Sequence, residues 1–226
     1  MGRHAKLKNL NEAKDLFRRF KMIGRMLNMK INAVVTNGSQ PLGTTVGPAL
    51  EAREVLEVLE RKDTNVDFVK KACFMTAVLL NMVRGIDIEN GVKRAMRCVK
   101  SGKTEEKLRK IIKAQGGNSR VKSRDIEIGA FSFVVKAQKN GYITRINNES
   151  IKVLGRSAGA PFDKGAGILL HRKISDRVDR GDKLFEIYAE ARNKLKECVK
   201  LVKHLDVYTI SSYKPKVKDV ILSWLR

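Results

Sequence analysis

The sequence predicts a mixed fold, in which an α/β segment is followed by a smaller α+β domain. Apolar residues in the first half recur at helical spacing, as in the run from Leu10 to Leu27. After Gly116-Gly117 the chain changes to short runs that alternate in polarity or are rich in β-forming residues. Because a glycine is a natural stop for a helix, we place the boundary between a domain over 1–117 and a domain over 118–226.

In the first part the spacing predicts helices joined by one short strand. Asn9 or Asn11 can cap the first helix, because its side-chain oxygen accepts a hydrogen bond from a free helical N–H. The third helix is so apolar that we expect it to be buried or to lie at an interface. The expected helices cover 11–28, 47–61, 66–83, 87–100 and 105–114, and the strand covers 30–35.

In the second part, turn signals separate short strands and two helices. Asn140-Gly141 is typical of a tight turn in a β-hairpin, and Gly181-Asp182 of a turn between two strands. The residues around the second turn resemble the barrel-sandwich domains of biotinyl and lipoyl carriers. A carrier lysine motif is absent from Ala189–Arg192, so no swinging-arm role is expected. The expected strands cover 126–135, 141–146, 165–171 and 183–188, and the helices cover 150–157 and 190–202.

The composition bounds the partners of this chain. A net charge of +23 over 226 residues attracts polyanions and phosphorylated molecules. The basic residues are spread along the chain, and only 6% of the residues are aromatic, so nucleic-acid binding is possible but not the favoured interpretation. No apolar run is long enough for a membrane helix. Cys73, Cys98 and Cys198 form neither a disulfide framework nor a metal motif, which favours a reducing, cytoplasmic setting.

The segment from Asn37 to Val55 is the strongest candidate for a functional loop. It follows the expected strand, gathers glycines and prolines, and leads into a helix. Such a loop presents the free N–H groups of a helix start beside glycines that allow an anion or another chain to approach closely. An ordinary connection between a strand and a helix explains the same composition.

Other motifs admit structural explanations. Residues 101–104 (SGKT) resemble the end of a phosphate loop, but Arg97 stands where its first glycine belongs, so a helix end explains them better. The glycine-rich residues 158–167 could touch a phosphate, and a rigid connection is the favoured role. The histidines at positions 4, 171 and 204 are widely spaced, and His171 lies on an apolar strand as a packing residue.

Three blocks together resemble the thymidine phosphorylase/pyrimidine nucleoside phosphorylase family, and most closely its archaeal branch, the AMP phosphorylases. The resemblance runs from about residue 2 to about residue 205. The first block is the signature loop, with Gly38, Ser39, Gln40, Pro41, Gly43 and Gly47, and its helix. The second block is 113–117, and the third comprises 158–171 with Gly181-Asp182.

The resemblance implies a fold, a reaction and a set of partners. The chain would comprise the C-terminal portion of the central α/β domain and a barrel-sandwich-like C-terminal domain. Inorganic phosphate, as co-substrate, would attack AMP to give adenine and ribose 1,5-bisphosphate without an organic cofactor or a metal in the reaction. The family's phosphate- and base-binding residues lie upstream of the matching segment, so no catalytic residue is assigned here. A potassium contact is carried over only to Glu12.

Two hypotheses follow. In the first, the chain is inactive alone and needs a missing N-terminal half or a second copy, which the helix over 66–83 and the unpaired edge of the strand over 30–35 would bind. In the second, it is a non-catalytic basic module that binds RNA or another anionic ligand, or that promotes oligomerisation.

Overall fold

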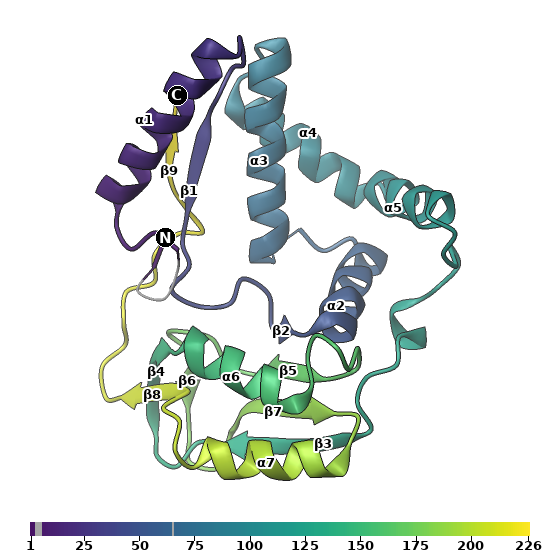
Figure 1. Ribbon diagram of the computed structural model, residues 1–226, viewed down its shortest axis with the longest axis vertical. Coiled ribbons are helices and arrows are strands. Elements are labelled where there is room, and N and C mark those ends of the chain that lie inside the picture. The colour runs from purple at the N-terminus through teal and green to yellow at the C-terminus, as the bar shows by residue number, and fades with distance from the viewer. Residues whose placement is uncertain (3–5, 65) are drawn as a thin grey trace. The chain divides into compact units, whose positions relative to one another are not determined.

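The computed structural model describes residues 1–2, 6–64 and 66–226, and the chain divides into two compact units. Unit 1 comprises Met1–Gly38, Val58–Arg120 and Lys218–Arg226, and unit 2 comprises Ser39–Glu57 and Val121–Val217. The mixed fold expected from the sequence is confirmed (Figure 1). The expected boundary at 117/118 lies close to the passage from Arg120 to Val121. The sequence did not predict that Ser39–Glu57 belongs to unit 2 and Lys218–Arg226 to unit 1.

Unit 1 is built mainly from helices. Its helices are α1 (Leu10–Met26), the last residues of α2 (Pro48–Arg61), α3 (Asp67–Arg84), α4 (Ile88–Lys100) and α5 (Lys103–Ala114), and its strands are β1 (Ala33–Thr36) and β9 (Ile221–Leu225). Its core contains Val69 and Cys73 of α3 and Val99 of α4. At the crossing of these helices a Cβ on Gly91 would lie 2.7 Å from the Cβ of Ala77, so only glycine permits this spacing.

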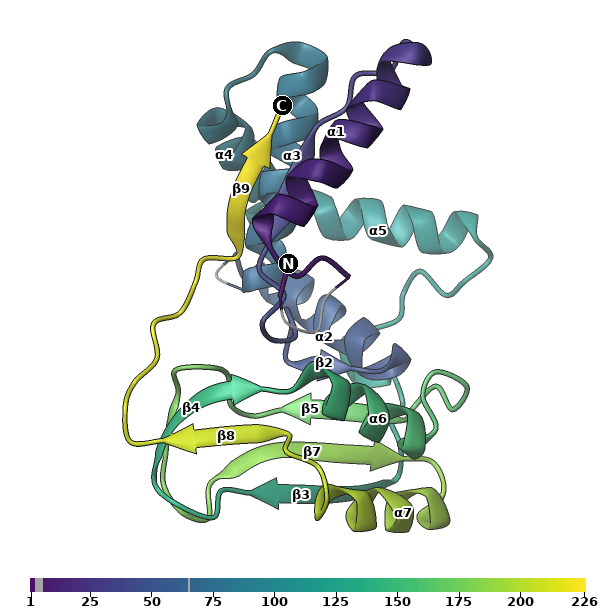
Figure 2. The same ribbon diagram turned by 60° about the vertical axis from the view of Figure 1, so that its left-hand side comes forward.

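The sequence predicted an unpaired edge for the strand over 30–35. This prediction is wrong for one of its two edges, because another strand pairs with it. β1 pairs antiparallel with β9, the strand nearest the C-terminus that Figure 2 labels. In this pairing Val34 lies opposite Trp224. The side chain of Asn37 continues the pairing by donating to the carbonyl of Lys218 over 3.1 Å. The error arose because the strand over Ile221–Leu225 is separated from its partner by almost the whole chain, and no local signal records such a pairing.

Unit 2 contains two small antiparallel sheets and two helices that cover one of them. The sheets have the orders β2-β5-β7-β3 and β6-β4-β8, and α6 and α7 pack on the first sheet (Figure 1). The strands are β2 (Thr45–Val46), β3 (Phe131–Lys136), β4 (Gly141–Ile146), β5 (Gly167–Leu170), β6 (Arg177–Val178), β7 (Lys183–Ala189) and β8 (Tyr208–Ser211). The helices are the first part of α2, η1 (Ser123–Asp125), α6 (Asn148–Ala158) and α7 (Arg192–Val202).

The expected hairpin at Asn140-Gly141 is wrong, because β3 and β4 belong to different sheets. The turn is instead bound to the turn that joins β6 to β7. The N–H of Arg180 donates to Oδ1 of Asn140 over 2.7 Å, and the N–H of Ala137 donates to the carbonyl of Asp182 over 2.8 Å. Turn chemistry therefore predicted the change of direction correctly, but it does not specify which strands pair.

The core of unit 2 lies between these sheets and helices. Phe185, Ile143, Leu154 and Ile168 are at most 1% exposed, and burying each side chain stabilises the fold by about 1.5–3 kcal/mol. The ring of Phe185 stacks on Tyr208 with a centroid distance of 5.7 Å. This core gives the outer surface of the first sheet a rigid support.

Candidate functional site

The two glycine-rich segments meet in unit 2. Strand β2, which follows the signature loop, pairs antiparallel with β5, which follows residues 158–166. Thr45 lies opposite Leu169 and Val46 opposite Ile168, and the N–H of Ala49 donates to the carbonyl of Lys164 over 3.0 Å. Residues that are more than a hundred positions apart thus form one local structure.

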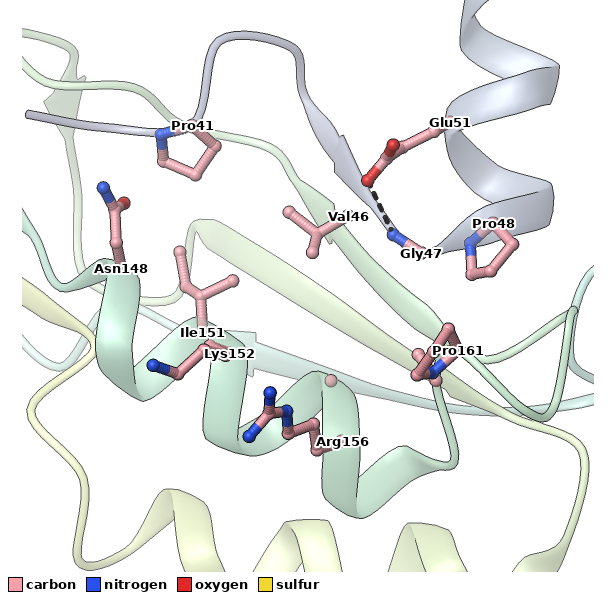
Figure 3. A pocket seen from close by; sticks show the side chains of 12 residues that line it. Pro41, Val46, Gly47, Pro48, Glu51, Asn148, Ile151, Lys152, Arg156 and Pro161 are labelled. Atoms are coloured by element: carbon pink, nitrogen blue, oxygen red, sulfur yellow. Dashed lines mark hydrogen bonds between the residues drawn. The ribbon is translucent and has the colours of Figure 1, made fainter. Parts of the chain in front are cut away.

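Glycine is required at this junction because two backbones touch. Gly47 has a φ of 130°, and a Cβ there would overlap the carbonyl oxygen of Ala166. A Cβ on Gly167 would overlap the carbonyl oxygen of Val46 in the same way. The N–H of Gly47 donates to Oε1 of Glu51 over 3.1 Å (Figure 3). The glycines therefore serve the approach of one backbone to another, and this N–H at the start of α2 is already bonded to a carboxylate.

Lys173 fixes the signature loop. Its ammonium group donates to the carbonyl oxygens of Pro41 and, over 2.7 Å, Gly43. The side-chain oxygen of Gln40 accepts from the N–H of Ile174 over 2.9 Å. Lys173, which sequence reasoning did not select, thus holds two of the predicted loop residues against the segment after β5, and its neighbour Ile174 holds a third.

Glu54 holds the other side of the loop. Its carboxylate accepts from the N–H and hydroxyl of Thr44 over 2.7 and 2.6 Å, and from the hydroxyl of Thr45 over 2.5 Å. A Cβ on Gly43 would lie 2.5 Å from Oε2 of this carboxylate. The signal in the sequence was Glu54 itself, an acid in the second turn of a helix that begins shortly after two threonines. No separate role was predicted for it.

A pocket of about 460 Å³ opens beside this loop. In Figure 3, Ile151 of α6 points toward Pro41 and Val46 across the pocket. The charged side chains of α6 that line it are Lys152, which is paired with Glu149, and Arg156. The other lining residues are Gly47, Pro48, Glu51, Asn148, Gly155, Ala160 and Pro161. The one carboxylate of this pocket, Glu51, is bonded to the N–H of Gly47. A mainly apolar pocket with a basic side and no free acid suits the binding or positioning of a group better than acid-base catalysis.

A titratable cluster lies on the outward face of β7. Glu186 and Tyr188 are two residues apart on this strand, and Oε2 of Glu186 is 3.5 Å from Nε2 of His171. Burial raises the pKa of Tyr188 to about 12, with further contributions from the charge of Glu186 and a hydrogen bond to it, while Arg53 acts in the opposite direction. His171 thus has a carboxylate neighbour in addition to the packing role expected from the sequence.

The remaining candidates do not line the pocket. Gly38 belongs to unit 1 and donates its N–H to the carbonyl of Met1, whereas Ser39 belongs to unit 2. Glu12 accepts from the N–H of Lys8 and from the side chain of Asn9, both over 2.8 Å, and so contributes to capping α1. This explains Glu12 without a cation, and the potassium contact stays a prediction.

Two other motifs have the structural roles that the sequence favoured. Residues 101–104 span the end of α4 and the start of α5, with Gly102 in the left-handed conformation at a φ of 79°. In the segment 158–167, Asp163 pairs with Lys194 over 2.6 Å and the N–H of Gly165 donates to Glu190 over 2.7 Å. His4 lies outside the described residues.

Metal-binding clusters and membrane-spanning helices are both absent from the described residues. Among them, no three His, Cys, Asp or Glu side chains gather in a way that could hold a metal ion. No helix within the described ranges has the length and apolar character needed to cross a membrane.

Comparison with known proteins finds a family resemblance within unit 2. Residues 142–209 match the family model of the pyrimidine nucleoside phosphorylase C-terminal domain. This segment lies within unit 2 and includes most of β4 and all of β5, β6 and β7. The resemblance to the C-terminal part of the nucleoside phosphorylases, expected from the sequence blocks, is confirmed.

The similar proteins are archaeal enzymes named AMP phosphorylase. The chain is 41% identical over 205 residues to that of Pyrococcus furiosus, covering 91% of this chain and 41% of the relative. It is 41% identical over 211 residues to AMP phosphorylase 2 of Archaeoglobus fulgidus, covering 93% of this chain and 41% of the relative. It is 40% identical over 202 residues to that of Methanococcoides burtonii, covering 89% of this chain and 40% of the relative. The chain thus spans about two fifths of the length of the curated relatives it matches.

The role of Lys173 predicts the effect of Lys173→Met. The variant keeps an unbranched side chain but removes the donor to the loop carbonyls, so the free energy of unfolding should fall by about 1–3 kcal/mol. Limited proteolysis should cut residues 39–44 faster than in the parent protein. Lys196→Met, at an exposed position of α7, is the matched control. An equal loss of stability in both variants would contradict the role of Lys173.

The glycine contact predicts a difference between two alanine variants. Gly47 and Gly181 both have a positive φ, but a Cβ on Gly181 meets nothing within 4 Å. Both variants should lose about 1 kcal/mol or more from backbone strain. Gly47→Ala should lose about 1–3 kcal/mol in addition through overpacking. Urea denaturation measures both, and equal losses would show that the approach to Ala166 is not tight.

The environment of Tyr188 predicts a pH dependence. The folded protein holds the phenol protonated up to about pH 12, whereas the unfolded chain releases the proton near its ordinary pKa of 10.0. The free energy of unfolding should therefore fall as the pH rises from 10 to about 12, and less so in Tyr188→Phe. Ultraviolet titration of both proteins isolates this phenol, and a midpoint near 10 would contradict the assignment.

Proposed function

We propose that this chain forms part of a nucleoside phosphorylase that acts on AMP. In the proposed reaction, inorganic phosphate attacks the anomeric carbon of AMP, the bond to the base breaks, and adenine and ribose 1,5-bisphosphate result. The support is an identity of about 40% to proteins named AMP phosphorylase over nine tenths of the chain. The match over 142–209 to a phosphorylase C-terminal domain supports the same class.

Within that enzyme, we assign to unit 2 the role of holding and positioning the signature loop. The observation that carries this role is the set of bonds from Lys173 and Glu54 to residues 41–45. A loop that is fixed from both sides can place substrate-contacting groups within the narrow tolerance that catalysis requires. The pocket beside the loop, with Arg156 on one side, offers a surface for an anionic substrate or for a neighbouring segment.

We further propose that this chain needs additional residues for activity. Phosphorolysis requires a phosphate cradle and electrostatic support for an oxocarbenium-like transition state. The carboxylates nearest the loop, Glu51 and Glu54, are bonded to backbone N–H groups. The catalytic groups would come from a longer form of the chain, from a separate partner or from a second copy.

Unit 1 offers an apolar surface for such a partner. Phe20 on α1 is 54% exposed, and Leu27, which directly follows α1, is 63% exposed. On α3, Leu79 is 61% exposed and Val83 is 78% exposed. Large apolar side chains exposed along a helix are typical of a contact surface. The sequence predicted that the helix over 66–83 is buried or lies at an interface. One face of α3 is buried in the core of unit 1, and the exposed apolar residues of its other face suit an interface.

The experiment is complementation. The chain is expressed with the part of the Pyrococcus furiosus AMP phosphorylase that it does not match, and adenine release from AMP is measured with and without inorganic phosphate. We expect phosphate-dependent release only when both pieces are present. Leu79→Asp should reduce the yield of the assembled pair by tenfold or more, since it places a charge on the apolar surface without disturbing the core.

The controls separate the possible failures. Lys196→Met should assemble and react as the parent does. Phosphorolysis by the chain alone would overturn the proposed need for further residues. A soluble, assembled pair that releases no adenine would overturn the proposed function itself.

A further inference from the structure

Four cationic side chains line a second pocket, which lies in unit 1 where α4 ends and α5 begins. The pocket has a volume of about 730 Å³, and its lining contains no carboxylate. Its residues are Arg94, Arg97, Cys98, Lys100, Ser101 and Lys103. We call this group the α4–α5 corner. It shares no residue with the pocket beside the signature loop.

The four corner cations form no ion pair with neighbouring acids among the described residues, although the pKa of Glu106 is lowered by its hydrogen bond to Lys110 and, to a smaller extent, by the charge of Lys103. On these two helices Glu89 pairs with Lys93 over 2.5 Å, Glu105 with Arg109 over 2.7 Å and Glu106 with Lys110 over 2.6 Å. In the part of the chain that the structure describes, none of the four corner cations takes part in an ion pair or a side-chain hydrogen bond. Their mutual repulsion is an energetic cost that an anion at the corner would relieve.

A fifth cation lies beside the turn that joins α4 to α5. The ammonium nitrogen of Lys62 lies 3.8 Å from the position that a Cβ on Gly102 would occupy. Gly102 joins the two helices and has no side chain, so its backbone does not obstruct access to the corner. The four corner cations thus come from two helices, and Lys62 adds a positive charge beside the turn between them.

Helix electrostatics explains only part of this arrangement. Arg97 and Lys100 lie in the last turn of α4, where a helix macrodipole favours cations. Arg94 lies before that turn, and Lys103 is the first residue of α5, where the macrodipole disfavours a cation. Stability of the two helices alone therefore does not account for Arg94 and Lys103.

We propose that the α4–α5 corner binds a compact ligand that carries several phosphate groups. The volume lies within the range of small-molecule sites, about 300–1,000 Å³. The lining contains no aromatic side chain on which a base could stack, so recognition rests on the phosphates. This differs from the phosphate loop suggested by residues 101–104, because the donors are side chains of two helices and not a run of loop N–H groups.

Cys98 supplies a reporter inside the corner. Its thiol is exposed, whereas Cys73 is 3% and Cys198 0% exposed, so the two buried thiols serve as internal references. Inorganic tripolyphosphate is the probe, and the rate at which iodoacetamide alkylates Cys98 is followed by mass spectrometry at low salt. We expect tripolyphosphate to slow this rate at least fivefold and inorganic phosphate to slow it much less.

Matched double variants separate the corner from the general positive charge. Arg94→Gln with Arg97→Gln should weaken tripolyphosphate binding at least tenfold in calorimetry. Lys14→Gln with Arg19→Gln removes two exposed charges from α1 of the same unit and should leave binding nearly unchanged. Circular dichroism checks that both double variants keep their helices.

Three results would overturn the proposal. One is the absence of protection of Cys98 at low salt. Another is equal loss of binding in the two double variants, which would indicate diffuse attraction by net charge. The third is single-stranded RNA that protects Cys98 better than tripolyphosphate at equal phosphate concentration, which would assign the corner to nucleic acid. None of these measurements depends on phosphorolysis, so they are independent of the complementation result.

Discussion

The pairing of β2 with β5 is the constraint on which the rest of unit 2 depends. β2 has only the two residues Thr45 and Val46, and a pair this short is marginal without further contacts. The contact of Gly47 with Ala166 and the bonds from Lys173 to the loop carbonyls add what the short ladder lacks. Through this junction, Ser39–Glu57 folds with Val121–Val217, although more than sixty residues of unit 1 separate them in sequence.

The same contacts limit what the loop can do chemically. The carboxylate of Glu54 accepts hydrogen bonds from Thr44 and Thr45 and so stabilises the loop. If this side chain moved, these donors would lose their partner. Glu51 is bonded to Gly47 in a similar way. The acids of the first turns of α2 thus act as structural side chains. This division of roles supports the proposal that this chain positions the loop while other residues carry out bond breaking.

The sequence predicted the helices well and the strand pairing poorly, for a physical reason. Helical periodicity is local, so residues expected at 66–83 and 87–100 form α3 and α4 almost as predicted. Pairing is a long-range property, and both the partner of β1 and the sheet of β4 were missed. The glycines of the signature loop were found from composition. Lys173 was not, because a lysine that binds carbonyls more than a hundred residues away leaves no local pattern.

The distribution of charge between the units connects the two proposals. Unit 1 contains 26 of the 47 lysines and arginines but only 10 of the 24 acids, although the sequence alone shows the basic residues spread along the whole chain. Within unit 1 most of the exposed large apolar side chains lie on α1, just after it or on α3, whereas the corner cations lie on α4 and α5. Ile111 on α5 is an exception, with 47% of its surface exposed. Apolar contact weakens little with added salt, while attraction to phosphate groups falls steeply with it. The ionic strength at which a partner or a ligand dissociates therefore tells which of the two surfaces binds it.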